Sequence, residues 1–158
     1  MRNLLSTKDQ RQLRLMKILI QHRDWLKLHE LADKLGCTER ILKSDLNELR
    51  AAFPTIDIQS SVNGIMIDLE VNTSVEVVYQ YFLAHSQSFQ LLEYLFFNEG
   101  LPIYRTIENL HSSNANLYRL GRNITKTLSA QFQIELSFTP SAIRGNEIDI
   151  RYFFAQYF

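Results

Sequence analysis

The sequence of 158 residues contains a single cysteine and no apolar run long enough to cross a membrane. One cysteine excludes an internal disulfide framework and suits a reducing cytoplasm. A membrane-spanning helix needs about 20 consecutive apolar residues, and the N-terminus is too polar and too helix-periodic for a secretory signal. We therefore expect a cytoplasmic protein that does not contact a membrane.

Patterns that support catalysis or metal binding are also missing from the sequence. Its four histidines lie far apart, without the cysteine or acidic neighbours that a structural metal site needs. The chain contains no paired carboxylates at catalytic spacing and no glycine-rich phosphate loop. We expect no enzymatic activity, no cofactor and no metal ion, and we interpret Cys37 as a packed turn residue.

The formal net charge is zero, but the charges are unevenly distributed. Residues 1–50 contain 11 Lys and Arg against 7 Asp and Glu, and residues 101–158 contain 6 against 4. Residues 51–100 contain 6 acids and no Lys or Arg. Because a polyanion responds to the local field rather than to the average charge, the two basic ends are compatible with a nucleic-acid partner.

The stretch His29–Phe53 predicts two helices separated by a tight turn. Gly36 and Cys37 supply the turn, since glycine ends a helix without steric cost, and Thr38 can cap the second helix. The buried seam of that helix is predicted at Leu42, Leu46, Leu49 and Phe53. This is the layout of a helix-turn-helix, and we expect a further helix before it, from Ser6 or Thr7 to about His22.

A β-hairpin is predicted directly after this pair of helices. Pro54 stops the second helix because it cannot donate the next backbone hydrogen bond. Asn63-Gly64 is a strong hairpin signal because both residues accept positive φ. Apolar residues alternate with polar ones on its two sides: Ile56, Ile58, Ile65, Ile67 and Leu69. A helix-turn-helix followed by a hairpin is a winged helix.

The second half of the chain repeats this order of elements at an offset of 75 residues. Two helices come first, one from Thr73 or Ser74 to His85 without positive charge, and one from Ser88 to Gly100. The paired positions are then Leu28 and Ile103, Leu35 and Leu110, Thr38 and Ser113, Leu42 and Leu117, and Leu49 and Ile124. A second wing is predicted from QIELSF and AIRGNEIDI, with Ile143, Ile148 and Ile150 pointing inward.

Two features of the second copy leave alternatives open. Gly121 stands where the first copy has Leu46, which costs about 1 kcal/mol relative to alanine, so that either another side chain fills the gap or the helix bends. The terminal RYFFAQYF is too aromatic for an exposed tail. Either it docks on the second module or it starts a further helix or domain, and we favour the second interpretation.

The candidate DNA-binding residues lie on the polar sides of the two predicted recognition helices. In the first helix Glu39, Asp45 and Glu48 lie among them, so a solvated face with i,i+4 ion pairs is the alternative. Residues 113–133 contain no acid, which frees their cations for phosphates. The candidates are Arg40, Lys43, Ser44, Asn47, Arg50, Ser113, Asn114, Tyr118, Arg119, Arg122 and Lys126.

The predicted wings add further candidates. Arg144 is a DNA-binding candidate in the second wing, and Ser60, Ser61 and Asn63 lie at the tip of the first. For the two serines and Asn63, ordinary turn chemistry is at least as good an interpretation.

These elements predict a mainly α fold with small β-hairpin wings, made of two tandem winged helix-turn-helix domains joined by a helical connector. The expected boundaries are residues 1–72 for the first domain, 73–87 for the connector and 88–150 for the second domain. Residues 151–158 would then begin a following helix or domain.

Several segments carry a resemblance to a known family: GCTERILKSDLNELRAAFP, SSVNGI, LLEYLFFNEG and GNEIDIRYFFAQYF. Together, from Leu4 to Phe158, they resemble the Mga family of transcriptional regulators from Gram-positive bacteria. Members act as global regulators, often activators, of virulence and metabolic genes. They typically continue into sugar-phosphotransferase regulatory domains and a domain similar to phosphotransferase component IIB, where regulation and oligomerisation reside.

The resemblance implies that this chain is the DNA-binding part of such a regulator. Its partner would be double-stranded DNA, read by sequence and by shape, with homo-oligomerisation through other regions and RNA polymerase as further candidate partners. Its histidines should not be taken for the family's phosphorylated ones: His22, His29, His85 and His111. The alternative from another class is a winged-helix protein-interaction module without direct DNA contact, and an RNA-binding antiterminator is disfavoured.

Overall fold

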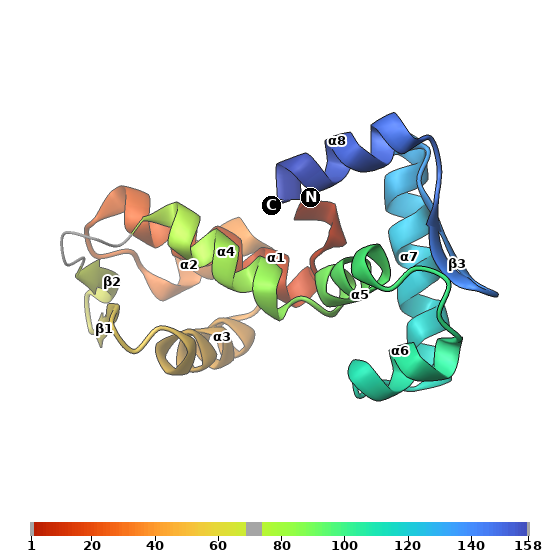
Figure 1. Ribbon diagram of the computed structural model, residues 1–158. Coiled ribbons are helices and arrows are strands. Elements are labelled where there is room, and N and C mark those ends of the chain that lie inside the picture. Colours follow the sequence, from red (N-terminus) through yellow and green to blue (C-terminus); the bar gives the residue numbers. More distant parts are fainter. Residues whose placement is uncertain (1, 69–73, 158) are drawn as a thin grey trace. The chain divides into compact units, whose positions relative to one another are not determined.

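The computed structural model describes residues 2–68 and 74–157 (Figure 1). The chain forms two compact units. The first unit is Thr7–Phe82, and the second combines the N-terminal residues up to Ser6 with Leu83–Phe158. Each unit contains a helix-turn-helix and an antiparallel two-stranded hairpin, so the predicted mainly α, tandem winged-helix fold is confirmed.

The first unit follows the predicted order of helices and strands. It contains α1 Thr7–His22, α2 Leu28–Leu35, α3 Glu39–Ala52, β1 Asp57–Ser61, β2 Gly64–Asp68 and α4, which is Val75–His85 and crosses the unit boundary. α1 starts directly after Ser6, and α4 starts directly after Ser74. The other predicted cap of α4, Thr73, lies outside the described residues, as does Leu69 of the predicted hairpin.

The turn between α2 and α3 has the predicted chemistry. Gly36 adopts a left-handed conformation with φ of 64°, and its backbone N–H donates back to Ala32 and Asp33. The Thr38 hydroxyl accepts from the backbone N–H of Ile41 at 3.3 Å, as an N-cap does. The predicted seam is confirmed, because its four members are at most 6% exposed: Leu42, Leu46, Leu49 and Phe53.

The turn of the first wing differs from the prediction by one residue. Ser61 pairs with Gly64, so that Val62 and Asn63 form the two-residue loop and Gly64 already belongs to β2. Of the pair Asn63-Gly64, Gly64 alone has a positive φ, of 125°. Its backbone also lies against Leu26, whose carbonyl oxygen would be 2.1 Å from a Cβ at this position. The glycine thus allows the backbone of Leu26 to approach β2 closely, and it does not form the hairpin turn itself.

Leu26 adds a short third strand-like segment to this hairpin. Two backbone hydrogen bonds, of 2.8 and 2.9 Å, join it to Ile65 in β2. The second unit repeats it: Ser141 accepts from Gly100 at 2.8 Å and donates to Leu101 at 3.2 Å. Because Leu26 and Leu101 are also 75 residues apart, the repeat extends to the strand-like segment in front of each helix-turn-helix.

The second unit contains the longer recognition helix. Its elements are η1 Arg2–Leu4, α5 Gln87–Phe97, α6 Ile103–Asn109, α7 Asn114–Phe132, β3 Glu135–Phe138, β4 Ser141–Arg144 and α8 Glu147–Tyr157. α5 begins at Gln87, so Ser88 lies inside the helix and not before it. The Ser113 hydroxyl caps α7 through the backbone N–H of Asn116 at 3.1 Å, and Leu117 and Ile124 are fully buried, as the repeat predicts.

Gly121 in α7 makes room for an aromatic ring of the wing. A Cβ at this position would lie 2.5 Å from the ring of Phe138, which is itself only 7% exposed. The side chain that fills the seam therefore comes from β3, which decides between the two alternatives left open by the sequence.

The second strand of the second wing is shorter than predicted. β4 ends at Arg144, and Ile148 and Ile150 belong to α8, where Ile148 is 74% exposed. The expectation that both point into the wing is wrong, because Asn146 starts a helix here: its side-chain oxygen accepts from the backbone N–H of Ile148 at 2.9 Å. Ile143 is in the strand and half-buried.

The aromatic C-terminal segment docks on the second unit, which is the first of the two alternatives. Phe153 and Phe154 of α8 are 1% and 3% exposed. The ring centroid of Phe154 lies 4.1 Å from that of Phe96 in α5, and the ring of Phe153 lies 5.5 Å from Phe132 in α7. α8 therefore closes the core of this unit over α5 and α7.

Candidate nucleic-acid interface

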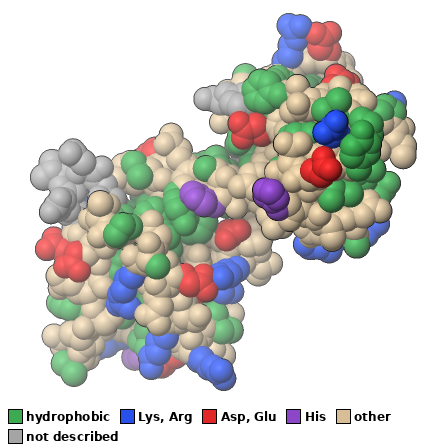
Figure 2. Space-filling model, turned by 60° about the horizontal axis from the view of Figure 1, so that its bottom comes forward, with side chains coloured by type: hydrophobic (Ala, Val, Ile, Leu, Met, Phe, Trp, Pro, Cys, Tyr) green, Lys and Arg blue, Asp and Glu red, His purple; other side chains and the backbone are tan. Residues whose placement is uncertain are grey.

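The exposed side of α3 carries four of the predicted DNA-binding residues. Arg40, Lys43, Ser44 and Asn47 are all exposed and lie opposite the buried seam. Among the residues that the structure describes, Arg40 and Lys43 form no ion pair. Lys and Arg side chains gather toward the lower end of the first unit, on the left in Figure 2. This face is electrostatically open to an anion.

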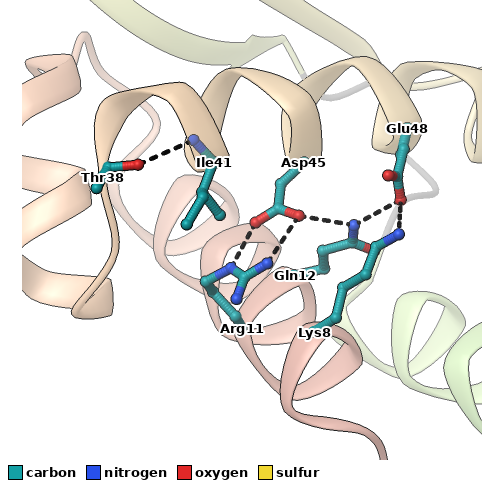
Figure 3. Close-up of polar contacts among 7 residues, drawn as sticks. All are labelled: Lys8, Arg11, Gln12, Thr38, Ile41, Asp45 and Glu48. Carbon is teal, nitrogen blue, oxygen red and sulfur yellow. Dashed lines mark hydrogen bonds and ion pairs between the residues drawn. The ribbon is translucent and has the colours of Figure 1, made fainter.

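The acids of α3 were expected to dilute this face, but Asp45 is not part of it. Its side chain is 3% exposed and points toward α1, where it accepts from Arg11 at 2.6 and 3.2 Å (Figure 3). Gln12 donates a third hydrogen bond to it at 3.0 Å. The hydrogen bond to Asp45 raises the pKa of Arg11 above its ordinary value. The alternative interpretation, a solvated face with i,i+4 ion pairs, therefore does not apply to Asp45.

Glu48 is also engaged by α1. Lys8 lies 2.6 Å from its carboxylate, and Gln12 donates to the same oxygen at 3.0 Å (Figure 3). The hydrogen bond from Lys8, followed by that from Gln12, holds the pKa of Glu48 below its ordinary value. Asp45 and Glu48 are thus paired with cations of α1, and of the three acids Glu39 alone is left on the exposed side of α3 without such a cation in the described part of the chain.

Arg50 occupies a different position from the other α3 candidates. It is half-buried at the edge of the helix, next to the first wing. Its Nε donates to the carbonyl oxygen of Ile58 at 3.0 Å, one terminal nitrogen donates to Asn47 Oδ1 at 3.3 Å, and the other donates to the hydroxyl of Ser60. Its guanidinium is therefore already engaged within the protein.

The exposed side of α7 carries three cations on one stripe. Arg119, Arg122 and Lys126 follow at spacings of three and four residues and are all exposed. No acid occurs between residues 113 and 133. Within the described part of the chain, Arg122 and Lys126 form no ion pair. The stripe therefore presents positive charge without local compensation.

Arg119 is held in place by a residue that the sequence did not select. Asn116 Oδ1 accepts from the guanidinium of Arg119 at 2.6 Å, and the amide nitrogen of Asn116 donates to the Ser112 hydroxyl at 2.8 Å. The i,i+3 spacing of Asn116 and Arg119 on a helix is the signal that could have predicted this pair. The bond orders one edge of the guanidinium and leaves its other donors available.

The remaining α7 candidates lie at its first turns. Ser113 uses its hydroxyl as the helix cap, and Asn114, the first helical residue, is exposed. Tyr118 is 38% exposed, and its ring packs edge to face on Phe138 of the wing at 5.2 Å between centroids. The glycine at 121 thus supports Tyr118 indirectly, through the ring that it accommodates.

The wings contribute less than the helices. Arg144 is exposed at the end of β4, and its cross-strand partner is the acid Glu135. In the first wing the Ser61 hydroxyl accepts from the backbone N–H of Asn63 at 3.0 Å, which is turn chemistry. Ser60 is the acceptor for Arg50.

Over 2–68 and 74–157, no three His, Cys, Asp or Glu side chains are grouped as ligands for a metal ion. No helix in these ranges is both long enough and apolar enough to span a membrane.

Comparisons with known proteins agree with this geometry. Residues 71–158 match a family model described as the Mga helix-turn-helix domain. Residues 6–65 match one described as the M protein trans-acting positive regulator (MGA) HTH domain. The two matched ranges cover the two helix-turn-helix pairs seen in the structure.

Two curated relatives cover nearly the whole chain. A protein of Streptococcus pneumoniae serotype 4 (strain ATCC BAA-334 / TIGR4), named "Putative trans-acting regulator", is 47% identical over 158 residues, which are 100% of this chain and 32% of the relative. The capsule synthesis positive regulator AcpA of Bacillus anthracis is 26% identical over 152 residues, which are 92% of this chain and 30% of the relative. The chain thus spans about a third of the length of these relatives.

Proposed function

The chain belongs to the Mga family, and on this premise we propose that it binds double-stranded DNA as the DNA-binding part of a transcriptional regulator. The observation that carries the proposal is the stripe of Arg119, Arg122 and Lys126, exposed on α7 in a segment without acids. Arg40 and Lys43 occupy the corresponding side of α3, where α1 engages Asp45 and Glu48.

Each recognition helix would lie in a major groove, with residues near its N-terminus at the base edges. The guanidinium of Arg119, which is ordered by its hydrogen bond to Asn116, could donate to N7 and O6 of guanine. Arg122 and Lys126, further along the helix, suit phosphates. Because few side chains can read bases, we expect modest sequence discrimination, with a contribution from the shape and bendability of the DNA.

The two units would bind one duplex together. Tethering makes the second contact intramolecular, so two weak contacts give a much tighter complex. With about six to eight phosphate contacts, the logarithm of the binding constant should fall with the logarithm of the salt concentration with a slope of about −5 to −7. A slope of this size distinguishes phosphate-dominated binding from apolar association.

A gel-shift series against salt tests the proposal, with a mixed-sequence duplex of about four helical turns as the probe. Replacing Arg119 and Arg122 by alanine should weaken binding and make the slope less steep by about two. Replacing Glu108, an exposed acid of α6, is the matched control and should have little effect. A flat salt response, or equal effects of the two sets of substitutions, would contradict the proposal.

The finer expectations belong to the same proposal. The family that matches residues 6–65 and the AcpA relative are both named for a positive regulator, which supports activation as the mode of control. The regulator would act in the cytoplasm on virulence and metabolic genes and would contact RNA polymerase. It would form oligomers through regions outside the third of the relatives that this chain matches.

A protein-interaction module is the second candidate, because the second unit exposes large apolar side chains. Phe97 is 65% exposed, Ile148 74% and Tyr152 59%. Failure to retard any duplex at low salt, together with a stable complex with another protein, would favour this function over DNA binding.

A further inference from the structure

Arg50 connects the recognition helix of the first unit to its wing. Its three hydrogen bonds reach the carbonyl oxygen of Ile58 and the hydroxyl of Ser60, both in β1, and Oδ1 of Asn47 on the exposed face of α3. A planar guanidinium can satisfy acceptors in several directions at once. One side chain thus fixes the first wing strand relative to a residue of the recognition face.

The second unit makes the same connection from the corresponding position. Thr125 lies 75 residues after Arg50, and its hydroxyl accepts from the backbone N–H of Leu136 in β3 at 2.9 Å. The donor is on the helix in the first unit and on the strand in the second. Two different chemistries thus link the recognition helix to the first strand of its wing from corresponding helix positions.

We propose that Arg50 is a positioning residue that sets the first wing and the Asn47 amide for DNA, and not a phosphate contact itself. The inference rests on the proposed DNA binding and reassigns one of the predicted contact residues. Because Oδ1 of Asn47 accepts from Arg50, Asn47 chiefly offers its N–H donors to acceptors such as N7 and O6 of guanine.

Replacing Arg50 by lysine distinguishes a positioning role from a phosphate contact, because lysine keeps the positive charge but lacks the planar guanidinium with its several donors. A phosphate contact survives in Arg50→Lys, whereas the three-way link does not. The tip of the wing, from Ser60 to Asn63, carries no charge. Loss of its contacts should therefore weaken binding without changing the number of counterions released, and so without changing the salt slope.

The experiment is the salt series on the full chain, with the same mixed-sequence duplex and four variants. Arg50→Lys and Arg50→Gln should both weaken binding by about tenfold at every salt concentration, with the slope of the unaltered chain. Arg40, an exposed cation of the same helix, supplies the matched control. Arg40→Gln should make the slope less steep by about one, and Arg40→Lys should keep the slope of the unaltered chain, because lysine carries the same charge as arginine.

Two outcomes separate this inference from the function on which it rests. Normal binding by Arg50→Lys, with a reduced slope for Arg50→Gln, would show a phosphate contact and overturn the positioning role alone. Failure of the unaltered chain to retard the duplex at low salt would overturn the proposed function, and this inference with it.

Folding of the variants is checked by the fluorescence of Trp25, the single tryptophan, which lies in the same unit. If neither Arg50 variant folds, Ser60→Ala alone should weaken binding with an unchanged slope, because it removes a hydrogen bond of Arg50 and keeps its charge. If they fold, Ser60→Ala and Arg50→Gln are compared singly and together. A positioning role predicts that the two substitutions are not additive, because they break one link. Additive effects would overturn it.

Discussion

Replacing Arg11 by leucine should destabilise the first unit by about 3 kcal/mol, because it leaves the buried Asp45 carboxylate without its cation. The side chain of Asp45 is 3% exposed, and after the substitution only Gln12 would still donate to it. We use the low end of the range for broken buried pairs, since the Arg11 side chain is 20% exposed and water can enter from its side.

The double variant Arg11→Leu with Asp45→Leu tests the same reasoning from the opposite side. It removes both charges and fills the space with apolar groups, so its stability should lie within about 1 kcal/mol of the unaltered chain. Gln12 keeps its hydrogen bond to Glu48 in this variant. The two substitutions should therefore be strongly non-additive.

Urea unfolding followed by Trp25 fluorescence is the assay, because this tryptophan reports on the unit that contains the pair. With an m-value of about 1.5 kcal/mol/M, a loss of 3 kcal/mol lowers the midpoint by about 2 M. An unchanged midpoint for Arg11→Leu, or a double variant as unstable as the single one, would refute the assignment of Asp45 as a buried, paired anion.

Three further substitutions or conditions test other parts of the structure. Gly121→Ala should destabilise the second unit by about 1–2 kcal/mol, although alanine has the better helix propensity, because its methyl group meets the Phe138 ring. Adding Phe138→Leu in a double variant should relieve this clash, and a Gly121→Ala variant that is more stable than the unaltered chain would contradict the packing of Phe138 on Gly121. His111→Gly should raise the melting temperature because His111 adopts a left-handed φ of 46°, which costs a non-glycine residue about 1 kcal/mol; a lower melting temperature would show that the imidazole contributes more than the strain. The lowered pKa of Glu48 should add stability at pH values above its ordinary pKa, and this stability is lost as the pH falls through the lower pKa of the folded state. Glu48→Gln should flatten that part of the pH profile, and an unchanged profile would contradict the Lys8 interaction.

The predictions that succeeded depend on local chemistry. Thr38 and Ser113 have the residue type and position of helix caps, and each accepts the backbone hydrogen bond that its role requires. The seam of α3 follows from helical spacing alone, and the offset of 75 residues transfers it to α7. Such patterns can be read from sequence because the interacting residues are neighbours along the chain.

The errors arise where local signals compete. Asn63-Gly64 resembles a hairpin turn, but Gly64 serves the approach of Leu26 and the turn lies one residue earlier. Ile148 and Ile150 continue an alternating pattern, yet Asn146 caps a helix there. In both places two motifs overlap in the sequence, and backbone hydrogen bonding selects one of them.

The sequence by itself determined two winged helices, their recognition helices and most of their basic residues, because periodicity, caps and turns act over a few residues. The tertiary structure alone decided how these residues are used. It assigned Asp45 to α1, Arg50 to the wing and the space at Gly121 to Phe138. Each of these depends on contacts between elements brought together only by folding, and no local pattern reports which side chain will meet another across that distance.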